Sequence, residues 1–383
     1  MSDPLDVLLA ESPDAAALRA DQTFADANAG RPVVLYGAGG VGRNVLAALR
    51  GAGVKPLCFA DRSADGTTSV DGLPVLGLAD AAARHGADAT FVVTILNPRF
   101  PFASVRDALH EAGCAHVVSW IPLAWRHAAA LLPYYAIDRP ERILAAADDI
   151  RRAYALLDDD RSREEFRRQL EWRLTGEFTL PEPLPVSEQY FSADVVTLVD
   201  DEVFVDCGAY DGDTLASFLE HNGGRFSRFV ALEPEPDNLA ALQARVAALP
   251  ADVAERVEIL PYASAADAGT VTFGGSGTGA GISEDGHLTV ETVALDDVVT
   301  GPVTYLKMDI EGAEPDALAG ATAIVVRDRP VLGLCAYHVP DHLWSLLLAV
   351  DDLADGYTYR MRRYGWDCWE VVLYALPTGR VAS

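Results

Sequence analysis

Two apolar segments of the chain run directly into glycine-rich turns, and this pattern restricts the fold more than any other feature. The first covers residues 33–36 and is followed by four glycines between residues 37 and 42. The second covers residues 203–207 and is followed by Gly208 and Gly212. An apolar strand, a glycine turn and a helix in this order are typical of a parallel α/β sheet. The 383 residues therefore predict two such domains.

Further apolar segments follow both turns at intervals that indicate alternating strands and helices. Strands are expected at residues 33–36, 56–60, 91–95, 116–119, 203–207, 229–232, 257–260, 303–308, 331–336 and 371–376, with a two-stranded excursion of 270–273 and 288–293 around a glycine-rich loop. Residues 139–173 instead have helical spacing, and Pro181, Pro183 and Pro185 follow as an extended connector.

These patterns predict an α/β fold with two Rossmann-like parallel-sheet domains joined by a helical linker. The expected segments are a helical N-terminus (1–30), a Rossmann-like nucleotide-fold domain (31–120), the linker (121–185) and a second α/β domain (186–383).

The net charge of −27 argues against nucleic acid and anionic membranes as partners. No apolar run approaches about 18 residues, and the acidic N-terminus does not resemble a signal peptide, so a cytoplasmic protein is expected. The five cysteines form no C-x-x-C pair, which excludes a disulfide framework and a zinc site. A small molecule is the expected partner, and the formation of a homo-oligomer is left open.

The second glycine turn is unusually acidic because it contains Asp206, Asp211 and Asp213. It lies where α/β folds bind ligands, but its carboxylates would repel a pyrophosphate. They suit a ligand that carries a sulfonium and an ammonium. Glu233 ends the next strand, at a position where an acid commonly binds ribose hydroxyls. The alternative is that these carboxylates only cap the following helix.

A second charged cluster ends the strand predicted over residues 303–308. Lys307, Asp309 and Glu311 alternate along one side, which is unusual for a buried parallel strand. We expect an active-site floor in which one carboxylate is a general base and Lys307 pairs with another; the alternative is a salt-bridged strand end. His338 follows the next strand and could take a proton from a substrate hydroxyl, or be structural. Two acids are not a coordination shell, so no metal is predicted.

The first glycine turn offers a second nucleotide site. Gly37, Gly39 and Gly42 fit G-x-G-x-x-G, and Asp61 ends the next strand, where a ribose-binding acid would stand. The alternative is a scaffold without a ligand. A Tyr-x-x-x-Lys pair is absent around both lysines, which excludes the chemistry of short-chain dehydrogenases and sugar epimerases.

The C-terminal half resembles FkbM-type methyltransferases. Residues 203–214 (Val-Phe-Val-Asp-Cys-Gly-Ala-Tyr-Asp-Gly-Asp-Thr) resemble the first motif of the family, and residues 307–314 (Lys-Met-Asp-Ile-Glu-Gly-Ala-Glu) are the most specific match. The resemblance continues at 232–234, 295–297, 337–338 and 371–375, and spans residues 186–377. Some members resemble this chain in carrying an N-terminal nucleotide-fold domain and a helical linker.

The resemblance implies a class I methyltransferase fold with S-adenosylmethionine as the cofactor. It implies methyl transfer, usually to a hydroxyl oxygen, on a sugar, nucleotide-sugar or secondary metabolite. The cofactor-binding residues expected are Asp206, Gly208, Tyr210, Asp211, Gly212, Thr214, Glu233 and Pro234, and the catalytic candidates are Lys307, Asp309, Glu311 and His338. Two alternatives stay open: an NAD(P)-dependent oxidoreductase acting through the N-terminal domain, and a non-enzymatic metabolite-sensing or scaffold protein.

Overall fold

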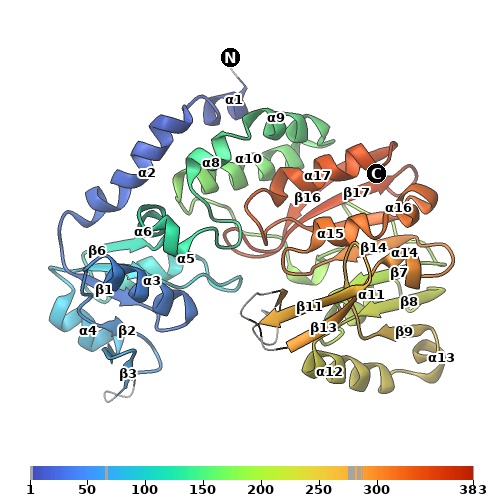
Figure 1. Cartoon of the computed structure of the whole chain (residues 1–383), viewed down its shortest axis with the longest axis horizontal. Helices are drawn as coiled ribbons and strands as arrows, with labels where there is room; N and C mark the ends of the chain where they lie inside the picture. Colours follow the sequence, from blue (N-terminus) through green and yellow to red (C-terminus); the bar gives the residue numbers. More distant parts are fainter. Residues whose placement is uncertain (1–2, 65–67, 275–280, 283–285, 287, 383) are drawn as a thin grey trace.

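The chain forms two lobes, each built on its own sheet, and a layer of helices connects them (Figure 1). The computed structural model describes residues 3–64, 68–274, 281–282, 286 and 288–382. Among these residues, no helix combines the length and the apolar character needed to cross a membrane.

The N-terminal sheet has the strand order β3-β4-β2-β1-β5-β6, and all its pairs are parallel except β3 with β4. The strands are β1 (Val33–Tyr36), β2 (Phe59–Ala60), β3 (Ser69–Val70), β4 (Leu73–Leu76), β5 (Thr90–Val93) and β6 (His116–Ser119). Its helices are α3 (Gly40–Gly51), α4 (Leu78–His85) and α5 (Phe102–Glu111). The chain crosses over between β1 and β5, so the loops after these two strands flank the position where open α/β sheets bind ligands.

The C-terminal sheet has the order β16-β17-β15-β14-β7-β8-β9. Its strands are β7 (Val203–Cys207), β8 (Arg228–Leu232), β9 (Val257–Leu260), β14 (Tyr305–Met308), β15 (Val331–Cys335), β16 (Tyr357–Arg363) and β17 (Val371–Pro377). The first five in chain order are parallel, whereas β17 is antiparallel to both β15 and β16. The parallel-dominated α/β architecture predicted for both halves is therefore confirmed.

A small sheet of order β10-β13-β11-β12 contains the predicted excursion. It consists of β10 (Ala263–Ser264), β11 (Gly269–Gly274), β12 (Gly281–Ile282) and β13 (Leu288–Val293), with β11 and β13 antiparallel. Residues 275–280 of the predicted glycine-rich loop lie outside the described residues.

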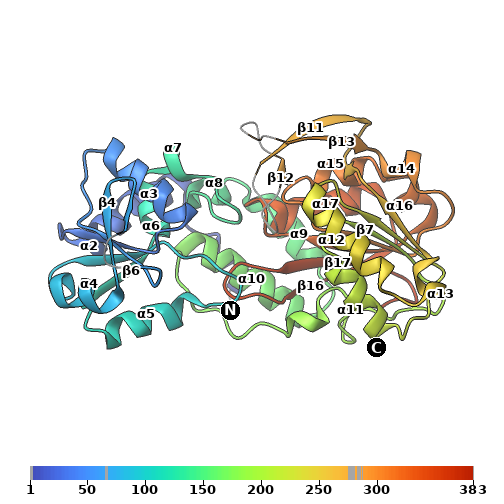
Figure 2. The ribbon, with the colours of Figure 1, turned by 90° about the horizontal axis from the view of Figure 1, so that it is seen from below.

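The remaining helices cover these sheets or connect the lobes (Figure 2). They are α1 (Pro4–Leu8), α2 (Pro13–Asn28), α6 (Ile121–Arg126), α7 (Ala128–Leu131), α8 (Pro140–Leu144), α9 (Ala147–Leu156), α10 (Asp160–Thr175), the 3-10 turn η1 (Val186–Glu188), α11 (Asp213–His221), α12 (Pro236–Ala247), α13 (Ala251–Ala254), α14 (Leu295–Val298), α15 (Glu314–Ala319), α16 (Thr322–Asp328) and α17 (His342–Leu353).

The connecting helices are divided between two hydrophobic cores. Ile143, Ile150 and Phe166, from α8 to α10, belong to the core of the C-terminal sheet. Trp125 of α6 belongs instead to the core of the N-terminal sheet. Helix α2 contributes to both cores, since Ala16 packs in the first and residues 20 and 24 pack in the second.

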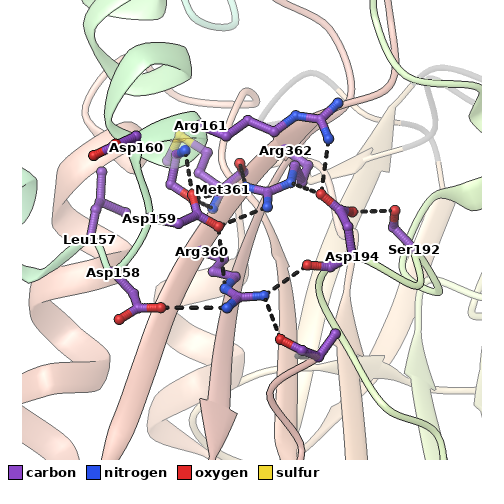
Figure 3. Close-up of polar contacts among 12 residues, drawn as sticks. Leu157, Asp158, Asp159, Asp160, Arg161, Ser192, Asp194, Arg360, Met361 and Arg362 are labelled. Atoms are coloured by element: carbon purple, nitrogen blue, oxygen red, sulfur yellow. Dashed lines mark hydrogen bonds and ion pairs between the residues drawn. The ribbon is translucent and has the colours of Figure 1, made fainter.

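A polar cluster fastens α10 to the edge strand β16 (Figure 3). Asp159 caps α10 by accepting from the Ser162 amide at 2.6 Å, and it also pairs with Arg362 of β16 at 2.8 Å. Arg362 pairs with Asp194 as well, at 3.0 Å. Burial opposes the ionisation of Asp159, but the hydrogen bonds from Arg362 and Ser162 lower its pKa to about 2. The helix is therefore joined to the sheet by charge as well as by apolar contact.

Candidate active site

The turns that follow β7 and β14 touch each other. The two strands are parallel neighbours, with Asp206 opposite Lys307. Gly208 has a φ of 80°, and a Cβ at this position would collide with the carbonyl oxygen of Asp309. Only glycine allows both the left-handed backbone and this close approach. The local sequence thus brings the two motifs into one site.

A buried ion pair lies beneath these turns. Lys307 Nζ is 2.8 Å from Asp206 Oδ1, and both side chains are almost completely inaccessible to solvent. The ammonium also donates to the Gly208 carbonyl oxygen at 2.7 Å. Burial raises the pKa of Asp206 to about 6, whereas Asp206 and the neighbouring Asp309 raise the pKa of Lys307 despite its burial. The pair therefore links β7, the glycine turn and β14.

Glu233 is buried where β8 ends. One carboxylate oxygen accepts from the Tyr210 amide at 2.8 Å, and the other accepts from the Glu235 amide at 2.9 Å. Burial raises the pKa of Glu233. Oε1 of Glu233 also accepts a long hydrogen bond from Asn238 Nδ2 at 3.5 Å, whereas the oxygen bonded to Tyr210, Oε2, can accept a second one, and the residue lines a cavity.

The cavity has a volume of about 1080 Å³ and lies between the lobes, above the carboxyl ends of β7, β8 and β14. From the predicted cofactor residues, it is lined by Gly208, Tyr210, Thr214, Glu233 and Pro234. From the predicted catalytic residues, it is lined by Lys307, Asp309 and Glu311. The two predicted sets of side chains thus meet in one space.

Three of the predicted cofactor residues do not line this cavity. Asp206 lies fully buried beneath it. Asp211 forms an ion pair with Arg245 at 2.8 Å and accepts from the same guanidinium through its backbone oxygen. Gly212 packs against Arg245 with a φ of 87°. Asp213, which begins α11, is the acid of this turn that lines the cavity.

The two carboxylates after β14 are held by tyrosines from elsewhere in the chain. Tyr190 Oη donates to Asp309 Oδ2 at 3.0 Å, and Tyr135 Oη donates to Glu311 Oε2 at 3.2 Å. Burial raises the pKa of Glu311 to about 7. Burial opposes the ionisation of Asp309, but the hydrogen bond from His338 and the charge of Lys307 lower its pKa far below its usual value. The two acids are therefore tuned in opposite directions.

His338 is enclosed by carboxylates on both ring nitrogens. Nδ1 is 2.7 Å from Glu314 Oε1, and Nε2 is 3.3 Å from Asp309 Oδ1. The other oxygen of Glu314, Oε2, is 3.2 Å from His342 Nδ1, so Glu314 lies between the two histidines. Burial favours the neutral ring, but Glu314 and Asp309 together raise the pKa of His338 well above its ordinary value. His338 does not line the cavity, and as a charged ring it has no free nitrogen to accept a proton.

Several site residues were not among the sequence predictions. Gln189, Tyr337 and Glu370 line the cavity together with Tyr135 and Tyr190. Glu370 accepts from Gln189 Nε2 at 2.9 Å and from Tyr337 Oη at 3.2 Å, and burial raises its pKa. Four of these residues lie outside the motifs that carry the family resemblance, whereas Tyr337 lies within its match at 337–338.

In the first glycine turn, the predicted ribose-binding residue Asp61 accepts hydrogen bonds from the protein itself. Asp61 Oδ2 accepts from the Ala38 amide at 2.8 Å, and Oδ1 accepts from the backbone and side chain of Ser63. Gly37 has a φ of 113°, and a Cβ on Gly42 would collide with the carbonyl oxygen of Gly37. These residues therefore have packing roles, while Gly39 borders open space.

No group of three or more His, Cys, Asp or Glu side chains within the described residues is arranged to hold a metal ion.

Residues 206–361 match the family model of the Methyltransferase FkbM domain, which confirms the resemblance drawn from the motifs. No curated protein sequence matches the chain significantly. Among solved structures, the methyltransferase FkbM from Methylobacillus flagellatus KT aligns with a TM-score of 0.79 and 22% identity, over 97% of this chain and 100% of that chain. This alignment shows that the fold of both lobes is shared.

Two further structures align with about half of the chain. One is an rRNA methylase from Streptococcus thermophilus, with a TM-score of 0.32 and 16% identity over 52% of this chain and 100% of that chain. The other is a Streptococcus mutans protein in complex with SAH, with a TM-score of 0.31 and 12% identity over 52% of this chain and 100% of that chain.

Proposed function

We propose that this chain, whose residues 206–361 carry the FkbM methyltransferase domain, uses S-adenosylmethionine to methylate a hydroxyl oxygen of a small acceptor. The acceptor classes proposed are a sugar, a nucleotide-sugar or a secondary metabolite. One observation carries the proposal: five of the eight predicted cofactor residues and two differently tuned carboxylates line the same cavity.

The groups around the cavity fit this cofactor in charge and in hydrogen-bonding capacity. Glu233 is buried and its Oε2 keeps accepting capacity, which suits a ribose hydroxyl. Asp213 lies at the first turn of α11 and suits an ammonium group, while Tyr210 and Thr214 border the same space. When bound, S-adenosylmethionine would supply an electrophilic methyl group on a sulfonium.

Glu311 is the proposed general base. It lines the cavity, and its pKa of about 7 places it near the value at which a base is both available and effective. It would take the proton of the acceptor hydroxyl at Oε1, which lies 3.9 Å from His338 Nε2, because Oε2 accepts the hydrogen bond of Tyr135. A positioned base of this kind contributes typically about 10²- to 10⁴-fold in rate.

Asp309 is proposed to orient rather than to take the proton. Its lowered pKa keeps it ionised and makes it a weak base, while His338 and Tyr190 fix both of its oxygens. His338 is proposed as a positioning residue, held charged by Glu314, in place of the base predicted from the sequence. Alignment of the reacting groups can supply about 7–11 kcal/mol of the barrier.

The two alternative functions gain no support from the geometry. An oxidoreductase would bind ribose through Asp61, but neither this residue nor the glycines of the first turn line the cavity between the lobes, whereas Glu233 does. A sensor or scaffold would not require a base tuned to neutrality beside a second, fully charged acid.

Calorimetric titration of the full chain with S-adenosylhomocysteine tests the cofactor proposal, with NAD as the comparison ligand. We expect binding of the first ligand, and about 10- to 100-fold weaker binding in Glu233→Gln because a charged hydrogen-bond acceptor is lost. Glu220→Gln, on the exposed side of α11, is the matched control and should bind normally. A folded protein that ignores S-adenosylhomocysteine at millimolar concentration would refute the proposal.

A further inference from the structure

The cavity is lined by both lobes, and residues 96–99 are its lining from the N-terminal sheet. Sites for single small ligands usually measure roughly 300–1,000 Å³. The volume of about 1080 Å³ lies just above this range, so a cofactor that needs less than the upper limit leaves part of the cavity for an acceptor. The lining includes residues 96–99, which are far in sequence from the methyltransferase motifs. The chemistry of this segment bears on what the second molecule is.

This segment has a defined shape. It follows β5, at the carboxyl end of the N-terminal sheet where such folds bind ligands. The Arg99 amide donates to Asn97 Oδ1 at 2.8 Å, and residues 97 and 100 form a β-bridge. The Trp366 amide, from the loop between β16 and β17, donates to the Pro98 carbonyl oxygen at 3.1 Å. The loop is thus held against the C-terminal lobe.

Charge is distributed unevenly along the cavity. The C-terminal wall carries Asp213, Glu233, Asp309, Glu311 and Glu370, and the ammonium of Lys307 on that wall is neutralised by its buried partner Asp206. The N-terminal wall presents Arg99, whose side chain is exposed.

Arg99 is also uncommitted. Within the described part of the chain, its guanidinium has no hydrogen-bond or ion-pair partner, although Glu182 borders the same cavity. An unpaired guanidinium at the wall of a cavity is suited to a carboxylate or a phosphate, which it can bind through two parallel hydrogen bonds.

Aromatic side chains occupy the wall between the base and this arginine. Tyr135 donates to Glu311 and packs against Trp369 in a tilted arrangement, with ring centroids 4.8 Å apart. Trp366 is joined to the segment that carries Arg99. Rings of this kind offer large apolar surfaces with polar edges, against which a compact ring of an acceptor can pack.

We infer that the acceptor is an anionic hydroxyl compound that spans the two lobes. Arg99 binds its phosphate or carboxylate, and the aromatic wall packs against its body. Its reactive hydroxyl faces Glu311, which rests on the proposed function. The N-terminal lobe would then select the acceptor, and the C-terminal lobe would perform the transfer.

Calorimetry of the full chain, saturated with S-adenosylhomocysteine, tests this inference with three probes that share one ring. The probes are glucose 6-phosphate, glucuronate and methyl glucoside, so that the phosphate and carboxylate arms are compared with a neutral ring. We expect at least one anionic probe to bind about 10-fold or more tightly than the neutral one. Arg99→Gln should abolish this preference, and Arg99→Lys should keep part of it. Arg106→Gln, at a half-exposed arginine of α5 that does not line the cavity, should leave it unchanged.

Equal binding of neutral and anionic probes, no binding of any anionic probe, or a preference that survives in Arg99→Gln would each overturn the inference. Cofactor binding is read separately, because every variant is first titrated with S-adenosylhomocysteine alone. If that ligand failed to bind, the proposed function would fall. A preference for anionic probes that depends on Arg99, measured in the absence of S-adenosylhomocysteine, would still support the anion site.

Discussion

Replacing Lys307 by methionine should expose the cost of leaving Asp206 alone in the interior. Methionine keeps the length of the side chain but removes the ammonium 2.8 Å from a carboxylate that has no solvent exposure. Removing one partner of a buried pair costs about 3–5 kcal/mol of folding free energy. The carboxyl can lessen this cost by taking up a proton, and the loss should therefore depend on pH.

The direction of this dependence follows from the pKa of Asp206. Burial raises it to about 6 with Lys307 present, and buried carboxyls without a partner reach roughly 8–9. A group whose pKa is raised in the folded state loses stability as pH rises toward that value. In Lys307→Met this loss extends above pH 6, where Asp206 of the unchanged protein is already ionised. At about 1.36 kcal/mol per pH unit, the destabilisation should grow by about 2–3 kcal/mol between pH 6 and pH 8.

Urea denaturation of the full chain at these two pH values measures the effect. The double variant Asp206→Asn/Lys307→Met removes both charges, so its destabilisation should be smaller and nearly independent of pH. A single variant that loses the same free energy at pH 6 and pH 8 would show that the carboxylate is hydrated, and would refute the reasoning.

The other predictions concern the base and the turn. Glu311→Gln should lower kcat about 10²- to 10⁴-fold while S-adenosylhomocysteine binding, measured by calorimetry, stays unchanged; normal turnover would remove Glu311 from the mechanism. The kcat of the unchanged protein should rise with pH through about 7 as Glu311 loses its proton, and a flat profile would contradict this role. Tyr135→Phe removes a hydrogen bond that lowers the pKa of Glu311, so the midpoint of the pH profile should move upward rather than remain in place. Gly208→Ala should destabilise the chain by about 1–3 kcal/mol or more in urea denaturation, because it combines a positive φ with a collision at Asp309. Gly224 has a φ of 73° and open space around it, so Gly224→Ala measures the destabilisation caused by the positive φ alone. An equal loss of folding free energy in both variants would show that the collision with Asp309 contributes nothing.

The strands that end in the site could be predicted because their signals are local. β7 and β14 are short apolar runs followed by glycine or by charged residues, and these signals do not depend on the rest of the chain. β16 escaped prediction because Arg360, Arg362 and Arg363 interrupt its apolar pattern. In the structure, these arginines pair with acids such as Asp159 and Glu165 at the sheet edge.

The partners of the catalytic candidates could not be predicted in the same way. Tyr135 lies 176 positions before Glu311, and Tyr190 lies 119 positions before Asp309. Both come from segments without a motif, and only the packing of the connecting helices brings them to the cavity. Residues of this kind require knowledge of the fold before they can be identified.

The role expected for His338 failed for a related reason. The ordinary pKa of histidine suggests a base near neutrality, but the environment decides the protonation state. Glu314 lies in the same motif as Asp309, and this nearby acid was the sequence feature that could have indicated an ion pair with His338. Asp211 likewise has the residue type that suits the cofactor, yet Arg245 of α12 draws it away from the cavity.

Helix α2 acts as a strut between the lobes. Its 16 residues extend for about 24 Å, with one end packed in each core. Arg19 on this helix donates to the Leu174 carbonyl oxygen, and Arg139 pairs with Asp21. A rotation of the lobes away from each other would require α2 to bend or to lose its packing contacts with one of the two cores. We therefore expect the lobes to keep their relative orientation while reactants enter and leave the cavity between them.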